Sequence, residues 1–207
     1  MKLRPVLLVS SAALLLAGYL GSSLREDTIA TASHRFGEAM VKSDTATIWT
    51  FVPDEERAYY GFDQRRFERF WTTIIEPRIK GLNSFHIESA SNNGLVVVLE
   101  SRDSKATSQK LSLLVSGQLG KYFCPYMVGY AVVGVANSGY AIRPTHKYEA
   151  FEHLAAWIRT NKSEFEAIGM TKIRRGPSYP SQTLDEIALQ WDKIARHDRQ
   201  RVKVAAK

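Results

Sequence analysis

The stretch from Asp63 to Ile75, DQRRFERFWTTII, decides the fold of this chain. Its apolar side chains recur at i, i+3, i+4, i+7 and i+8, which places them on one face of a helix. They are Phe67, Phe70, Trp71, Ile74 and Ile75. Asp63 is suited to cap this helix at its start, and Pro77 to end it. Because so much aromatic surface is unfavourable in water, we expect the helix to lie on a broad apolar sheet.

Shorter helices are expected before this segment. From Asp27 onward, apolar residues at helical spacing predict an amphipathic helix with one buried face, made by Ile29, Ala32, Phe36, Ala39 and Met40. Ser43-Asp44 ends this helix and caps a short one. Pro53 begins a further turn, whose acidic residues suit the positive N-terminal end of a helix, and Gly61 ends it.

After Gly81 the pattern changes to a period of two, which is typical of strands. Phe85 and Ile87 face one way, and His86 and Glu88 the other. Asn93-Gly94 is the strongest hairpin signal in the chain. Strands are therefore expected over 95–101 and 109–115. The run 121–135 is aromatic and β-branched, which favours strand, although a helix over 126–136 remains an alternative.

Two helices and a basic tail are expected after Pro144. The first covers about 147–168, and Gly169 is placed to end it. Thr183-Leu184-Asp185-Glu186 forms a capping box that opens the last helix, over 184–195. The tail 196–207 is rich in arginine and lysine, and we expect it to fray.

The composition excludes some classes of site. The net charge of +7 belongs mostly to Lys2, Arg4 and the tail, so the body is almost neutral. A nucleic-acid-binding face is therefore not expected. Cys124 is the one cysteine of the chain, which excludes an intramolecular disulfide and a multi-cysteine zinc site. No metal site and no cofactor are predicted.

The N-terminus predicts contact with a membrane. Lys2 and Arg4 precede an apolar run, PVLLVSSAALLLAGYLG, of about 17 residues. Residues 1–24 are therefore predicted to be either an uncleaved transmembrane anchor or a cleaved signal peptide. The first alternative implies a membrane-tethered protein with an extracytoplasmic body. The second implies a secreted or periplasmic protein.

The order of elements resembles a known superfamily. A helix, a short Asp-led helix, an aromatic helix and a run of antiparallel strands follow one another, with Phe36–Met40 (FGEAM) leading to Lys42–Ala46 (KSDTA). This order is similar to the nuclear-transport-factor-two-like superfamily, which includes ketosteroid isomerases and scytalone dehydratases. The resemblance covers about residues 28–135. It implies an α+β fold with N-terminal helices on a curved, cone-like antiparallel sheet over 28–142, followed here by a helical extension over 143–195.

The resemblance implies a cavity rather than one reaction. Its most plausible aromatic lining is Trp49, Tyr60 and Trp71. His86 and Glu88, about 7 Å apart on one strand face, are the candidates for acid–base chemistry. The leading hypothesis is a non-catalytic module that binds a small apolar ligand or an envelope protein. The alternatives are an isomerase- or dehydratase-like enzyme and an assembly or scaffold subunit, and the oligomeric state stays open.

Overall fold

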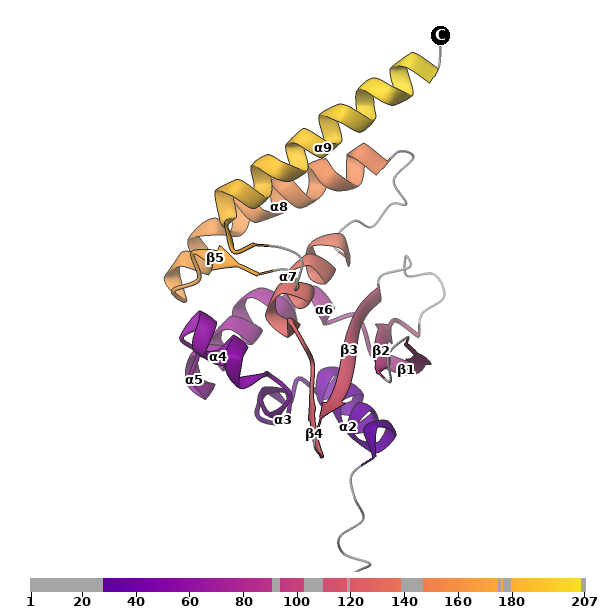
Figure 1. Cartoon of the computed structure of the whole chain (residues 1–207), viewed down its shortest axis with the longest axis vertical. Coiled ribbons are helices and arrows are strands. Elements are labelled where there is room, and N and C mark those ends of the chain that lie inside the picture. Colours follow the sequence, from indigo (N-terminus) through magenta and orange to yellow (C-terminus); the bar gives the residue numbers. More distant parts are fainter. Residues whose placement is uncertain are drawn as a thin grey trace, which may run out of the picture.

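The computed structural model describes residues 28–90, 94–102, 110–118, 120–138, 147–174, 176 and 180–205. Figure 1 shows helices packed on a small sheet and a long helical pair that extends from one end of the molecule. The predicted fold class is confirmed: the chain is α+β, with an antiparallel sheet, N-terminal helices on that sheet and a C-terminal helical pair.

The main sheet is an antiparallel meander. Its strands are β1 (Ser84–Ser89), β2 (Leu95–Glu100), β3 (Lys110–Gln118) and β4 (Lys121–Phe123), hydrogen-bonded in that order. The register aligns Phe85 with Leu99 and Leu99 with Leu111, so alternate apolar residues share the inner face. A second sheet pairs β5 (Lys172–Ile173) with β6 (Gln182–Thr183).

Three helices lead up to the aromatic helix. They are α2 (Ile29–Lys42), α3 (Thr45–Thr50) and α4 (Asp54–Tyr60). The predicted boundaries are confirmed: Ser43 ends α2 in the left-handed conformation with a φ of 52°, and Asp44 accepts the Thr47 N–H to cap α3. Helix α2 packs closely on β1, because a Cβ on Gly37 would lie 2.4 Å from the Phe85 ring.

The aromatic helix has the predicted buried face, but it does not end where the sequence suggested. All five predicted apolar residues are buried, and Asp63 caps the helix by accepting the Arg66 N–H at 2.7 Å. The helix runs as α5 (Gln64–Phe70), a π-helical turn η1 (Trp71–Ile75) and α6 (Glu76–Ile79), so it continues through Pro77. A proline ring clashes with the carbonyl four residues earlier in a regular helix. The wider π turn immediately before Pro77, with the Glu76 N–H bonded to the Trp71 carbonyl, accommodates that ring.

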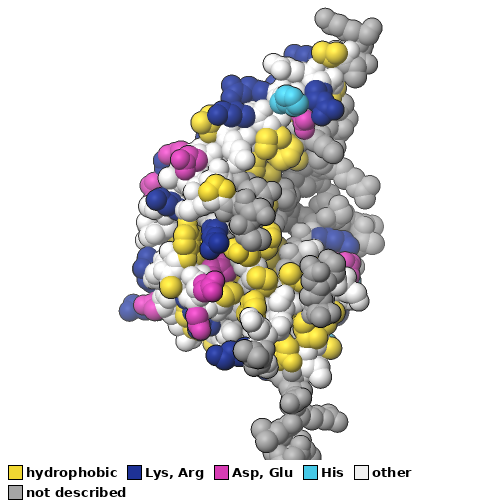
Figure 2. Space-filling model, in the orientation of Figure 1, with side chains coloured by type: hydrophobic (Ala, Val, Ile, Leu, Met, Phe, Trp, Pro, Cys, Tyr) yellow, Lys and Arg dark blue, Asp and Glu magenta, His cyan; other side chains and the backbone are white. Residues whose placement is uncertain are grey.

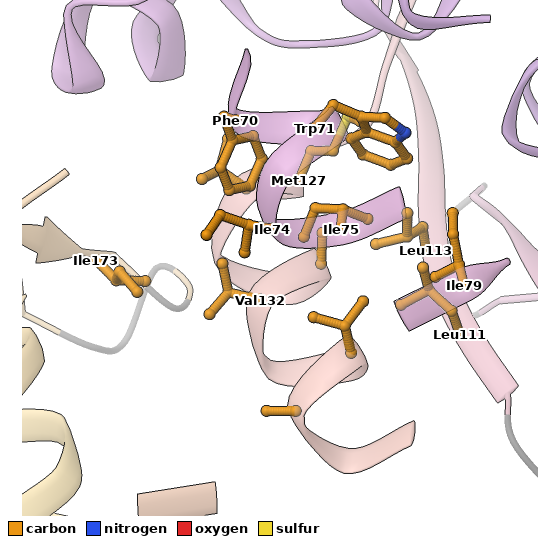
Figure 3. Close-up of a cluster of buried hydrophobic side chains, with 14 of the residues drawn as sticks. Phe70, Trp71, Ile74, Ile75, Ile79, Leu111, Leu113, Met127, Val132 and Ile173 are labelled. Atoms are coloured by element: carbon orange, nitrogen blue, oxygen red, sulfur yellow. The ribbon is translucent and has the colours of Figure 1, made fainter. Parts of the chain in front are cut away.

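The segment after β4 is a helix, which agrees with the alternative expected over 126–136; the strand favoured over 121–135 is wrong beyond Phe123. Helix α7 (Met127–Ser138) packs on β3 with an apolar face. Figure 3 shows Met127 and Val132 among Trp71, Ile75 and Leu113 in the core. Gly134 lets α7 approach the sheet, because a Cβ there would lie 2.3 Å from the Leu111 Cδ1 atom. Tertiary packing therefore overrides the local β propensity.

The C-terminal pair consists of α8 (Lys147–Ala167) and α9 (Leu184–Ala205), which pack along each other. The capping box is confirmed: the Glu186 side chain accepts the Thr183 N–H at 2.7 Å, and the Thr183 hydroxyl accepts the Glu186 N–H at 3.2 Å. The expected fraying of the tail is wrong up to Ala205, because α9 continues through it. Arg199 donates to Glu152 of α8, and its guanidinium lies over the Tyr148 ring, which ties the tail to α8.

The prediction of a transmembrane anchor is corrected. None of the helices in the part of the chain that the structure describes is long and apolar enough to cross a bilayer. The segment on which that prediction rested, residues 1–24, lies outside the described residues. The described residues therefore give no support for attachment to a membrane or for an extracytoplasmic location.

Candidate functional site

A cleft of about 700 Å³ opens beside α4. Its walls come from the residues around the start of α4, from β4, from the turn before α7, and from Arg174 after β5. Over the part of the surface where α4 and α7 lie, Figure 2 shows acidic and basic side chains next to hydrophobic ones. The cleft thus joins segments that are far apart in the sequence and combines aromatic with charged groups.

Glu56 forms the buried floor of this cleft. It is 9% exposed, and its two carboxylate oxygens accept the N–H groups of Met127 and Val128, each at 2.9 Å. These are N–H groups of the first turn of α7, which have no partner within the helix. Glu56 therefore caps α7 from another element. Burial raises the pKa of the Glu56 carboxyl to about 7, although the backbone N–H groups favour its charged form.

Tyr60 lies one helical turn after Glu56 and connects α4 to the segment after β5. Its hydroxyl accepts the Arg174 N–H at 2.9 Å, and burial raises the pKa of this phenol. Its ring packs edge-on against that of Tyr59, with the centroids 4.7 Å apart. The Tyr59 hydroxyl in turn hydrogen-bonds to Ser181, which precedes β6. Both tyrosines are therefore held in place from two directions.

Two cationic side chains that line the cleft, Lys121 and Arg174, form no ion pair within 4 Å with a carboxylate among the described residues, although the charge of Arg174 acts on the nearby Glu56 carboxyl and partly offsets the rise in its pKa that burial causes. The Arg174 guanidinium lies over the Tyr126 ring, 5.2 Å from its centroid. Tyr126 has a φ of 55°, an unusual conformation for a bulky residue, at the turn that leads into α7. By contrast, Arg57 is paired with Asp54 at 3.2 Å and donates to the Trp49 carbonyl at 2.7 Å.

The predicted lining residues separate into two groups. Tyr60 lines the cleft, as the sequence suggested. Trp71 is fully buried in the core and Trp49 packs against the Phe67 ring beneath the Arg57 guanidinium, and neither lines the cleft. The Trp71 indole N–H has no hydrogen-bond partner within the described part of the chain. Both tryptophans contribute to packing in this structure.

The structure brings His86 and Glu88 together on the open face of the sheet. The His86 Nε2 atom lies 2.8 Å from the Glu88 Oε1 atom, and its Nδ1 atom lies 3.1 Å from Glu100. The His86 side chain is 39% exposed, and neither residue lines the cleft. These two carboxylates raise the pKa of His86. His86, Glu88 and Glu100 therefore form a network on the surface. Lys110 extends it by an ion pair with Glu100, at 3.1 Å.

The described residues offer neither a metal site nor a reactive thiol at the cleft. No group of three potential metal ligands occurs among the described residues. Cys124 is buried behind the cleft, and burial raises the pKa of its thiol, which keeps the sulfur protonated and unreactive.

Sequence reasoning missed Glu56 and Arg174. It treated Glu56 only as one of the acidic residues that suit the start of the turn after Pro53, although the spacing of four residues to Tyr60 would have put both on one helix face. Arg174 belongs to a short connecting segment and carries no local signal. Comparisons of this chain with models of protein families, with characterised proteins and with solved structures gave no match.

Proposed function

We propose that this chain binds a small, flat aromatic ligand with an acidic group in the cleft beside α4, and that it does not transform the ligand. One observation carries the proposal: tyrosine rings and two cations that form no ion pair within 4 Å with any described carboxylate, Lys121 and Arg174, line the same cleft of about 700 Å³. The acidic residues of the lining, Asp54 and Glu55, belong to the exposed start of α4. Sites for small organic ligands commonly have volumes of about 300–1,000 Å³ and combine apolar walls with a few polar groups.

The side chains fit the two parts of such a ligand. A guanidinium presents two parallel N–H groups to a carboxylate, and Arg174 is already oriented by the ring of Tyr126. The rings of Tyr59 and Tyr126 offer faces and edges against which an aromatic ring packs. Lys121, at the β4 side of the cleft, adds a second positive charge. The ligand's acid would thus lie toward Arg174 and its ring between tyrosines.

The position of Glu56 supports binding over acid–base catalysis. Both of its oxygens accept N–H groups of α7, so a structural task already occupies the one carboxyl buried at the cleft. The acid–base pair that the sequence suggested, His86 and Glu88, lies on the open face of the sheet. A general base must reach the proton that it removes. Glu56 is engaged with α7 and His86 lies outside the cleft, so neither is placed to remove a proton from a ligand in the cleft.

The test is a titration of the full chain with 2-naphthoate, followed by calorimetry and by NMR shifts of cleft residues. Arg174→Gln should weaken binding about tenfold or more, because a hydrogen-bonded charge pair is lost. Tyr126→Leu should also weaken binding. The matched controls are Lys80→Gln, which changes an exposed residue, and Tyr148→Leu on α8; neither residue lines the cleft, so both variants should leave the affinity unchanged.

A neutral probe separates recognition of the acid from general stickiness. 2-Naphthylmethanol lacks the carboxylate, so it should bind more weakly to the unaltered chain and should be insensitive to Arg174→Gln. Absence of saturable binding of 2-naphthoate at millimolar concentration would exclude the proposal. Equal loss of both probes in Arg174→Gln would show that the arginine does not bind the acid.

A further inference from the structure

Among the strands that the structure describes, β1 is an edge of the main sheet. It hydrogen-bonds to β2 on one side, and no strand among the described residues pairs with its other side. Figure 1 shows β1 at the outer margin of the sheet. Edge strands are commonly protected by lysine, proline or a bulge. The sequence of β1, SFHIES, contains neither lysine nor proline.

The side chains of β1 alternate between two environments. Phe85 and Ile87 face the helices and pack partly against the core. His86 and Glu88 lie on the open face, in contact with each other. The open face of β1 therefore carries a cation and an anion two residues apart, His86 and Glu88. The face toward the helices carries two half-buried apolar residues, Phe85 and Ile87.

This pattern is complementary to itself. When two copies of a strand pair antiparallel around a twofold axis perpendicular to the sheet, opposed residues lie on the same face. The axis then runs midway between one residue of the strand and the same residue of the second copy. With the axis at Ile87, His86 lies opposite Glu88 of the second copy, and Glu88 lies opposite its His86. Axes at His86 or at Glu88 would place like residues opposite each other, which is unfavourable for charges.

We propose that β1 pairs antiparallel with β1 of a second copy of this chain, centred on Ile87, so that two four-stranded sheets join into one. Two pairs of opposite charge, each between His86 of one copy and Glu88 of the other, then form on the open face. An Ile87–Ile87 contact forms between them on the inner face. The exposed network already reaches from Glu88 through His86 and Glu100 to Lys110. Pairing would extend that network across the dimer axis and would give hydrogen-bond partners to the backbone groups on the side of β1 that no described strand pairs with.

The test is sedimentation of the full chain over a wide concentration range at pH 6, where His86 is protonated. The unaltered chain should show a concentration-dependent dimer. His86→Glu and Glu88→Lys each oppose like charges across the axis, so each should raise the dimer Kd about tenfold or more. Glu164→Lys, on an exposed position of α8, changes the charge as Glu88→Lys does and should leave the Kd unchanged.

Mixing the two edge variants gives the most discriminating result. The edge with two carboxylates then faces the edge with two cations, so the mixture should form a heterodimer, although each variant alone is monomeric at the same concentration. A monomer at all concentrations of the unaltered chain would overturn the proposal. An unchanged Kd in both single variants, or a mixture that stays monomeric, would overturn it too.

A measurement on the unaltered chain keeps the proposal testable should a variant fail to fold. Amide hydrogen exchange of a peptide covering 84–89 should slow as the concentration rises through the dimer Kd. A peptide from α8 should exchange at the same rate throughout. Concentration-independent exchange in β1 would exclude its pairing with a second copy.

Discussion

Replacement of Glu56 tests how the cleft and α7 depend on each other. Its carboxylate is the acceptor for the Met127 and Val128 N–H groups at the buried start of α7. Glu56→Ala leaves both without a protein partner, and each buried unsatisfied N–H costs about 1–3 kcal/mol. We therefore expect Glu56→Ala to lower the free energy of unfolding by about 2–5 kcal/mol. Glu56→Gln keeps one carbonyl acceptor and should cost less.

The pH dependence gives a sharper expectation. Burial raises the Glu56 pKa from 4.5 to about 7 in the folded chain. Between these two values the folded state holds a proton that the unfolded state has released, so the free energy of unfolding falls as the pH rises through this window. One pH unit corresponds to about 1.4 kcal/mol, so the full contribution of Glu56 is about 3 kcal/mol. It is fully present below pH 4.5 and lost above pH 7.

Urea denaturation from pH 4 to pH 8 measures this contribution, with Glu56→Gln as the uncharged reference. The stability of the unaltered chain minus that of Glu56→Gln should fall by about 3 kcal/mol between pH 4.5 and 7. Glu55→Gln alters the exposed neighbour, and its difference curve should stay within about 0.5 kcal/mol of a constant value. A flat curve for Glu56→Gln, or one that rises with pH, would refute the assignment of a buried carboxyl with a raised pKa.

Two further substitutions test the packing and the capping of the fold. Gly134→Ala would bring a Cβ to 2.3 Å from Leu111. It should therefore lower the free energy of unfolding by about 1–3 kcal/mol in the same urea assay. Combined with Leu111→Ala, the two losses should not add, because the two residues are in contact. Asp63→Ala removes the acceptor of the Arg66 N–H at the start of α5, so it should lower the free energy of unfolding by about 1 kcal/mol. Glu68→Ala, on the same helix, is the control and should lower it less. Equal losses in the two variants would contradict a capping role for Asp63.

The sequence predicted best where local pattern and tertiary packing agree. Asp63 and the Thr183–Glu186 box are local caps, and the buried face of the aromatic helix follows from its spacing alone. The course of that helix through Pro77 was not predictable in the same way. A proline usually ends a helix, and only the conformation of the preceding turn decides whether the chain accommodates it.

The failure at α7 and the failure to find the cleft have the same physical origin. Residues 127–138 have β-branched and glycine-containing sequence, yet they form a helix because Glu56 caps its start and Gly134 fits against Leu111. Both contacts join segments that are distant in the chain. The Glu56 contact also forms the floor of the cleft. A sequence pattern of period two or 3.6 carries no information about such pairs.

The opposite situation holds for β1, where the sequence placed His86 and Glu88 on one strand face and left their role open. Their spacing of two residues predicts this placement, which the structure confirms. The same spacing suits a catalytic pair, a surface ion pair and a self-complementary edge, because all three need only neighbouring opposite charges. What separates them is position in the sheet: the inner face would bring the pair to the core, whereas the open face of an edge strand leaves it exposed and within reach of a second copy. Position in a sheet depends on long-range strand order, so the function of a short charged motif follows from topology and not from the motif itself.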